Sequence, residues 1–283
     1  MSPDSNPAAP PGPTTLESLR HYASSQTKLI ESALESPHLF KTPDNFYWME
    51  LWRATWGKDP DSFDKPERVE SGPDSTNNSL IFPGVVPSNR NVMSKPDVLN
   101  NCWGPFECKK IFIRSEYKEA EEFLLSICGS GMDYDAVVIA GQPGIGLSHF
   151  CSAAMGSLDI LSGKSVFLVR TLLRRLALKL PTALQIYPDH ALLFYQGGVK
   201  EFVHLYSRAM YNCLSPEGGT LARIWALVDS GQELKEPSPV FKGDPFFVVE
   251  MLSSCPTRSE WTRRIRYEPF YMKQWAFSEV LQV

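Results

Sequence analysis

The segment that most constrains the fold is an uninterrupted apolar run, Ala136–Ala140, followed at once by the glycine-rich sequence GQPGIG at 141–146. An apolar run of strand length is typical of a parallel strand that is buried on both faces. The glycines let the next residues curl tightly, because glycine adopts backbone conformations that other residues avoid. Together, the two features predict a buried strand that ends in a tight loop.

A loop of this kind is suited to binding phosphate. It supplies the first six positions of the Walker A motif, G-x-x-x-x-G-K-[ST], in the strand-to-loop setting that the motif requires. Successive backbone N–H groups would form a nest for an anion, and the next helix would direct its N-terminal dipole at the same phosphate. We expect the nest to comprise Gly141, Gln142, Pro143, Gly144, Ile145 and Gly146.

The motif is interrupted after its sixth position. Leu147 occupies the lysine position, and leucine has neither a charge nor a hydrogen-bond donor for the β- and γ-phosphates. Lys164 and Ser165 occur further on, and they would follow Gly146 directly if the seventeen residues 147–163 were absent. With glycine at about 7% of residues, a chance Gly-Lys-Ser within twenty positions has a probability of about one in a hundred.

We therefore interpret 147–163 as an insertion, with a short in-frame intron retained in the coding sequence as its proposed source. Lys164 would then contact the phosphates of ATP, and Ser165 would bind Mg²⁺. Two alternatives stay open: a diverged loop with a coincidental Gly-Lys-Ser, and a glycine-rich turn that binds nothing. In the full chain, the simplest backbone path starts the next helix at Leu147. We therefore expect the full chain to bind ATP poorly or not at all.

The second half of a nucleotide site is an acid at the end of another strand. The apolar run Ile224–Val228 ends in Asp229, which we expect to hold Mg²⁺ together with Ser165. Many ATPases of this type carry a glutamate beside that aspartate to activate water, whereas this chain has Ser230 there. Glu233 is the nearest substitute as a catalytic residue, and an ordinary loop carboxylate is the alternative interpretation. We expect hydrolysis only if the phosphate loop is intact.

The rest of the pattern predicts an α/β domain with a mainly parallel sheet flanked by helices. We expect a short strand or turn at 111–113, and helices at 115–128 and about 165–180. We expect strands at 182–187, 191–195, 224–228 and 246–250, with 182–187 and 191–195 paired around a turn. The strand at 246–250 leads to Ser253 and Ser254, polar residues that could sense the γ-phosphate. The final stretch, 259–283, is expected to be helical with a break at Pro269.

The chain divides into four regions. Residues 1–13 are a proline-rich tail that we expect to be disordered. Residues 14–56 form a helical segment, with one helix at 16–34 and a second after Pro43. Residues 57–110 are rich in Gly, Pro, Asp, Ser and Asn, a composition typical of a long loop or linker. Residues 111–283 form the P-loop NTPase-like domain.

Three features offer surfaces for other partners. Trp48, Trp52 and Trp56 share one helix face, and a buried contact with the main domain is favoured over a peptide-docking surface. Two basic clusters are interpreted as solvated helix faces, with a nucleic-acid patch or an arginine finger as the alternatives. They comprise Arg170, Arg174, Arg175 and Lys179, and Arg263, Arg264 and Arg266.

Composition excludes some classes of protein. Apolar residues make up 43% of the 283 residues and aromatic residues 12%, which excludes wholesale disorder. A net charge of −4 argues against a surface that grips nucleic acid everywhere, but it leaves a local basic patch open. No run approaches the ~18–20 apolar residues of a membrane span, and the N-terminus does not resemble a signal peptide. We expect an intracellular protein, cytoplasmic or nuclear, whose six scattered cysteines are reduced thiols.

The region from Ile111 to Val283 resembles the P-loop NTPase module of Crinkler and retrotransposon-hot-spot type proteins, found in large fungal and protist families. The resemblance rests on Val137–Gly146, Lys164–Gln185, Trp225–Asp229 and Phe246–Glu250.

This resemblance implies an additional-strand P-loop fold in which Lys164, Ser165 and Asp229 bind the phosphates and Mg²⁺. Family members often couple the module to a downstream nuclease-like domain. We expect neither a lid nor a nuclease here, because the sequence ends soon after the fourth strand. The main rival to nucleotide binding is a non-catalytic module that keeps the fold and contacts a protein partner through the tryptophan face or the Leu/Arg helix.

Overall fold

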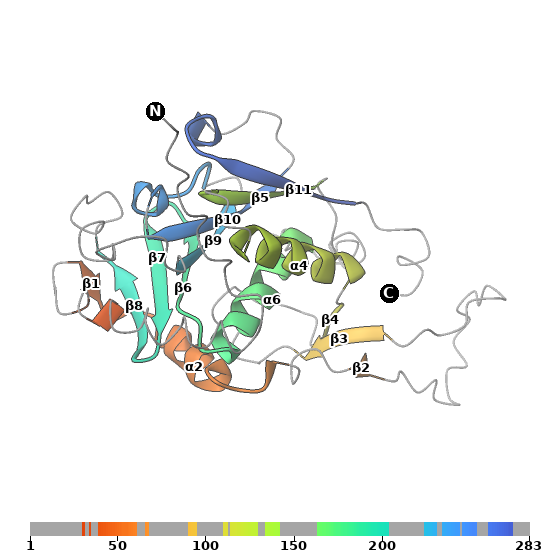
Figure 1. Ribbon diagram of the computed structural model, residues 1–283. Helices are drawn as coiled ribbons and strands as arrows, with labels where there is room; N and C mark the ends of the chain where they lie inside the picture. Colours follow the sequence, from red (N-terminus) through yellow and green to blue (C-terminus); the bar gives the residue numbers. More distant parts are fainter. Residues whose placement is uncertain are drawn as a thin grey trace, which may run out of the picture.

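The larger part of the fold is one mixed sheet with helices packed on it (Figure 1). The structure, a computed structural model, describes residues 30–31, 34, 39–60, 66–67, 90–94, 110–112, 114–129, 134–141, 163–203, 224–230, 234–243, 245–253 and 260–273. They include an eight-stranded sheet and a three-stranded sheet. The fold is α/β, as the alternation of strands and helices predicted.

The eight-stranded sheet has the order β1-β8-β7-β6-β9-β10-β5-β11. Strands β6, β9, β10, β5 and β11 run parallel to one another, and β7, β8 and β1 continue the sheet in antiparallel fashion. The bounds are Phe40–Lys41 for β1, Ala136–Gly141 for β5, Thr182–Tyr187 for β6, His190–Tyr195 for β7, Gly198–Phe202 for β8, Ile224–Ser230 for β9, Phe246–Ser253 for β10 and Tyr267–Met272 for β11. The predicted pairing of 182–187 with 191–195 is confirmed.

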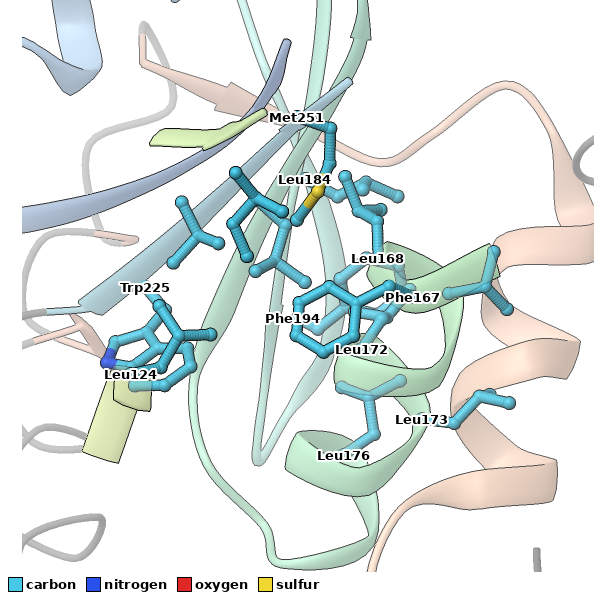
Figure 2. Packing of buried hydrophobic residues seen from close by; sticks show 14 of the residues in the cluster. Leu124, Phe167, Leu168, Leu172, Leu173, Leu176, Leu184, Phe194, Trp225 and Met251 are labelled. Atoms are coloured by element: carbon cyan, nitrogen blue, oxygen red, sulfur yellow. The ribbon is translucent and has the colours of Figure 1, made fainter. Parts of the chain in front are cut away.

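Helices α2 (Phe46–Thr55), α4 (Ser115–Gly129) and α6 (Gly163–Ala177) share one apolar core with one face of the sheet. The side chains of Leu168, Leu172 and Leu176 recur along α6 and are fully buried in this core (Figure 2). The opposite face is covered by a second core, to which the 3₁₀ helices η2 (Pro239–Phe241) and η3 (Glu260–Arg263) contribute. The predicted helices at 115–128 and about 165–180 are therefore confirmed, within a few residues at their ends.

The tryptophan face of α2 belongs to the helix-side core. Asn45 caps this helix by accepting a hydrogen bond from the backbone N–H of Tyr47. The Trp48 ring meets Phe194 edge-on, with 6.1 Å between centroids, and it is buried. Trp52 donates from Nε1 to the carbonyl oxygen of Tyr195 at 2.9 Å. The expected buried contact with the main domain is confirmed, and this face is not a free docking surface.

A smaller sheet contains β2 (Pro66–Glu67), β3 (Arg90–Ser94) and β4 (Lys110–Phe112), paired in antiparallel fashion. Strands β2 and β3 lie inside the range that composition assigned to a loop or linker. No period-2 alternation marks these residues in the sequence, because very short strands rich in polar residues do not alternate clearly. The strand expected at 111–113 corresponds to β4.

The expected helix over 259–283 is wrong for the residues that the structure describes there. Residues 260–263 form η3, and Tyr267–Met272 form β11, a fifth parallel strand paired with β5. The chain therefore has a further strand after the one at 246–250. Pro269 lies within β11, at the edge of the sheet, where a missing N–H is tolerated. Phe270 packs against Phe123 of α4, with ring centroids 5.3 Å apart.

Several predictions concern residues outside the described ranges. These are the tail at 1–13, most of the helix at 16–34 (where Ile30, Glu31 and Leu34 are helical), and residues 142–162. Among the cysteines, the structure describes Cys128, which is not in a disulfide. In the described ranges, no helix is long and apolar enough to span a membrane.

Candidate functional site

The parallel strands end at a common edge of the sheet, and two of the expected site residues, Gly141 and Asp229, lie near the ends of their strands. Strand β5 ends at Gly141, which is level with Ser253 at the end of β10. Asp229, near the end of β9, is level with Met251 of β10. Strand β10 lies between β5 and β9, so Asp229 is two strands away from the glycine-rich loop. Carboxyl ends of parallel strands are where ligands bind in open α/β sheets.

Asp229 lies on the face of the sheet that carries the helices. Side chains alternate along a strand, and Trp225 and Leu227 of β9 belong to the helix-side core. Ala226 and Val228 belong to the core on the opposite face. Asp229 therefore shares its face with α6, whereas Ser230 points to the other side.

Helix α6 runs antiparallel to the strands, so its first turn lies at the same edge. Near its C-terminus, Arg175 contacts Thr182 and Trp225, which lie at the starts of β6 and β9. Near its N-terminus, Phe167 packs on Tyr117 of α4, with ring centroids 5.7 Å apart. That end of α4 is tied to the carboxyl end of β11, because Arg114 donates to the carbonyl oxygen of Lys273 at 3.3 Å.

The length of α6 agrees with this orientation. Fifteen residues at about 1.5 Å each give about 22 Å, which is close to the length of a seven-residue strand such as β9. A helix that begins over the carboxyl edge therefore ends over the starting edge, as the contacts of Arg175 require.

Helix α6 begins at Gly163-Lys164-Ser165. These are the residues that would complete the interrupted motif, and they occupy the first turn of the helix packed over β9, β10 and β6. The path expected for the full chain, in which the next helix starts at Leu147, lies outside the described residues. Residues 142–162 and Glu233 lie outside the described ranges, so neither the loop nor the catalytic assignment is tested.

A buried carboxyl on the opposite face was missed by sequence reasoning. Glu250 of β10 has no exposed surface. Its Oε1 accepts a hydrogen bond from Ser230 Oγ at 2.6 Å, and its Oε2 accepts one from Trp261 Nε1 at 3.1 Å. Burial raises the pKa of Glu250 to about 7, although both hydrogen bonds favour the charged form. Its position at the end of an apolar run, FFVVE, was the available signal.

The basic cluster on α6 is not a solvated helix face, so that expectation is wrong. Arg170 and Arg175 are buried. Arg170 and Arg174 both bind the carboxylate of Glu121 on α4, at 2.7 and 2.8 Å. Arg175 stacks on Trp225 at 4.2 Å from the ring centroid, and burial lowers its pKa to about 9. Lys179 alone of this cluster is exposed.

The second basic cluster is exposed, as expected, and lies at the other edge of the sheet. Arg263, Arg264 and Arg266 are exposed. The backbone of Arg266 is bonded to Asp135, which directly precedes β5. A six-residue strand separates this edge from the carboxyl edge by about 20 Å. The cluster therefore does not supply an arginine finger to its own chain's site.

The residue types expected to hold Mg²⁺ suit that ion chemically. Asp229 offers carboxylate oxygens and Ser165 a hydroxyl, and hard oxygen donors of this kind are what Mg²⁺ takes in nucleotide sites. The described ranges contain no group of three or more His, Cys, Asp or Glu that could hold a metal by itself. Such a site would therefore depend on phosphate and water for its other ligands, as nucleotide sites do. No family model, curated protein or solved structure matches the chain.

Proposed function

We propose that this domain binds ATP with Mg²⁺ at the carboxyl edge of its parallel strands, through a phosphate loop of the Walker A type that is complete when 147–163 are absent. The observation that carries the proposal is the start of α6 at Gly163-Lys164-Ser165. The contacts at both ends of α6 support a first turn at the edge where β5 ends at Gly141 and where Asp229 lies. A strand, a glycine-rich loop and a helix that starts with Gly-Lys-Ser are the parts of such a loop.

The roles follow from the chemistry of each group. Backbone N–H groups of 141–146 and of the first turn of α6 would surround the phosphates, since a helix N-terminus favours an anion. Lys164 would neutralise the β- and γ-phosphates, Ser165 would bind Mg²⁺ directly, and Asp229 would bind the ion or its waters. Bound Mg²⁺ would supply charge neutralisation on the phosphates.

The strand order supports the P-loop NTPase assignment and the resemblance to the Crinkler and retrotransposon-hot-spot module. That resemblance implies an additional-strand fold, with one strand between the phosphate-loop strand and the strand of the metal-binding acid. In this sheet β10 lies between β5 and β9. Hydrolysis is not part of the proposal, because Ser230 points away from the Asp229 face and is bonded to Glu250.

The rival function is a non-catalytic interaction module. The two surfaces suggested for it, the tryptophan face and the Leu/Arg helix, are packed inside the domain. Trp48 is buried against Phe194. On the Leu/Arg helix, Arg170 and Arg175 are buried and the leucines belong to the core. Neither surface is available to a partner without unpacking the domain. Nucleotide binding therefore has the stronger support.

The test compares the full chain with a variant that lacks 147–163. The deletion joins Gly146 to Lys164, so the affinity for a fluorescent ATP analogue should rise at least roughly a hundredfold, about 2.7 kcal/mol. Lys164→Ala in the deletion variant should abolish the gain, because the lysine–phosphate contact is charge-assisted. Lys118→Ala, which removes an exposed charge from α4, is the matched control and should leave the gain intact.

Cooperative unfolding in urea should be checked first, so that a failure to fold is not mistaken for a failure to bind. A folded deletion variant that binds the analogue no better than the full chain would contradict the proposal. If the deletion variant does bind ATP, a separate assay is needed to assign hydrolysis. Release of phosphate from ATP, lost in Glu233→Gln, would assign both hydrolysis and the catalytic role of Glu233.

A further inference from the structure

Glu250 occupies a position where packing alone does not call for a carboxyl. It lies in the middle of the sheet, with no exposed surface, level with Val138 of β5 and Val228 of β9. Burying an ionisable group among such neighbours is costly unless every polar atom is satisfied. An apolar side chain of similar volume would fill the same space without that cost. The carboxyl therefore points to a task other than filling the core.

The contacts of Glu250 indicate that task. Its two oxygens accept hydrogen bonds from Ser230 Oγ and Trp261 Nε1, at 2.6 and 3.1 Å. Ser230 is the last residue of β9, and Asp229 directly precedes it. Strand β10 is hydrogen-bonded to β9 on one side and to β5 on the other, so its backbone is held in place from both sides. Glu250 thus holds the end of β9 from the face opposite to Asp229.

A second contact holds the connection that follows β9. Gln185 of β6 accepts a hydrogen bond through Oε1 from the backbone N–H of Ser238, at 2.9 Å. Gln185 is buried and level with Val228, so it lies on the same face as Glu250. The chain leaving Asp229 is therefore tied to the sheet at Ser230 and again at Ser238.

We propose that Glu250 is a positioning residue for Asp229: by binding Ser230 it fixes the backbone that aims the Asp229 carboxylate at Mg²⁺. This role rests on the nucleotide site proposed above. It resembles the general behaviour of residues that support a metal ligand without touching the metal, whose loss lowers metal affinity. Here the support passes through the backbone of β9, because the two side chains lie on opposite faces of the sheet.

The experiment uses four substitutions, made in the full chain for hydrogen exchange and in the variant lacking 147–163 for ATP affinity, each compared with the same chain without the substitution. Ser230→Ala and Glu250→Leu break the contact, whereas Glu250→Gln keeps one acceptor oxygen for Trp261 and gains an N–H that Ser230 Oγ can accept. Thr182→Val is the matched control, because it removes a buried hydrogen-bonded hydroxyl at the opposite edge of the sheet. Two quantities are measured: amide hydrogen exchange at residues 228–230, and ATP affinity with Mg²⁺ relative to ATP affinity with EDTA.

Ser230→Ala and Glu250→Leu should speed exchange at the end of β9 and lower the Mg²⁺-dependent gain in affinity about tenfold. Affinity measured with EDTA should stay within about twofold of the unsubstituted chain for both, because neither residue faces the phosphates. Glu250→Gln should leave both the exchange rate and the Mg²⁺-dependent gain at the values of the unsubstituted chain, and so should Thr182→Val.

Unchanged exchange in Ser230→Ala would overturn the positioning role, and so would faster exchange with an unchanged Mg²⁺-dependent gain. Absence of any Mg²⁺-dependent gain in the unsubstituted deletion variant, with ATP binding detected in EDTA, would refute the metal role of Asp229 and the positioning role with it. Absence of ATP binding in the full chain and in the deletion variant would instead refute the proposed function. The exchange data would still show whether Glu250 holds β9.

Discussion

Replacing Glu250 by glutamine should remove a pH dependence of stability that the wild-type chain carries. Burial raises the pKa of Glu250 from 4.5 to about 7, with Glu236 adding to the rise, while Ser230, Trp261 and Lys242 oppose it. Between these two pH values the folded chain holds a proton that the unfolded chain has released. Stability falls with rising pH wherever the folded state binds more protons. The contribution of protonated Glu250 to the free energy of unfolding is therefore fully present below about pH 4.5 and is lost as the pH rises through about 7.

The magnitude follows from the same two pKa values. Each pKa unit corresponds to about 1.4 kcal/mol, so the step from 4.5 to about 7 corresponds to about 3 kcal/mol of free energy of unfolding. Between pH 5 and pH 8 the expected change is about 2.5 kcal/mol, because ionisation of the unfolded chain has already begun at pH 5. Glutamine has nearly the same shape and no titration, so the variant lacks this term at every pH.

Urea unfolding of wild type and Glu250→Gln at pH 5 and pH 8 measures the term directly. The free energy of unfolding of the variant, relative to that of wild type, should be about 2.5 kcal/mol higher at pH 8 than at pH 5. Glu122→Gln is the matched control, because Glu122 is exposed on α4, and its difference from wild type should change little. Equal differences between wild type and Glu250→Gln at both pH values would refute the reasoning, because Glu250 would then carry the same charge in both states.

Three further predictions follow from single positions. Asp229→Ala, made in the deletion variant, should weaken Mg²⁺-ATP binding much more than metal-free ATP binding, and an equal loss would mark Asp229 as structural. Gly57→Ala should lower the free energy of unfolding by about 1–2 kcal/mol, because Gly57 has φ +69 and a Cβ there would lie 2.5 Å from Lys179 Cε. An unchanged urea midpoint would show that the backbone relaxes. Thr171→Val should stabilise the chain by about 1 kcal/mol, since the Thr171 hydroxyl is buried in α6 with no hydrogen-bond partner, and a destabilised variant in urea unfolding would contradict this.

Local pattern was sufficient to predict the strands and helices of the centre of the domain. The apolar runs of β5, β9 and β10 and the paired strands around Pro188 were visible as sequence, because buried parallel strands and tight turns have distinctive compositions. The order of the strands in the sheet could not be predicted from the sequence. Neighbouring parallel strands are joined by long connections, and no local sequence pattern indicates which strands pair. The separation of β5 from β9 by β10 became visible only in the sheet.

The failures have a common physical cause, which is that tertiary contacts override local preference. Tyr267–Met272 contains a proline and three aromatic residues, and pairing with β5 decides its structure. Arg170 and Arg175 looked like surface residues because arginine is mostly exposed. They are buried because each has a partner distant in the sequence. Arg170 forms an ion pair with Glu121, and the planar guanidinium of Arg175 stacks on Trp225. Glu250 was missed for the same reason.

The separation of Gly146 from Lys164 can be judged from the two ends that the structure describes. Strand β5 is held between β10 and β11, and α6 is held by the core and by the ion pairs of Arg170 and Arg174. Removal of 147–163 leaves six Cα–Cα steps from Gly141 to Lys164, which span at most about 20 Å. The contacts of α6 and α4 place both ends at the same edge of the sheet, so we expect a connection of that length to leave the packing of α6 unchanged. The insertion hypothesis therefore demands a deletion variant that folds with an unaltered core. A variant that unfolds would show that the residues between the two ends are needed to hold them where they are.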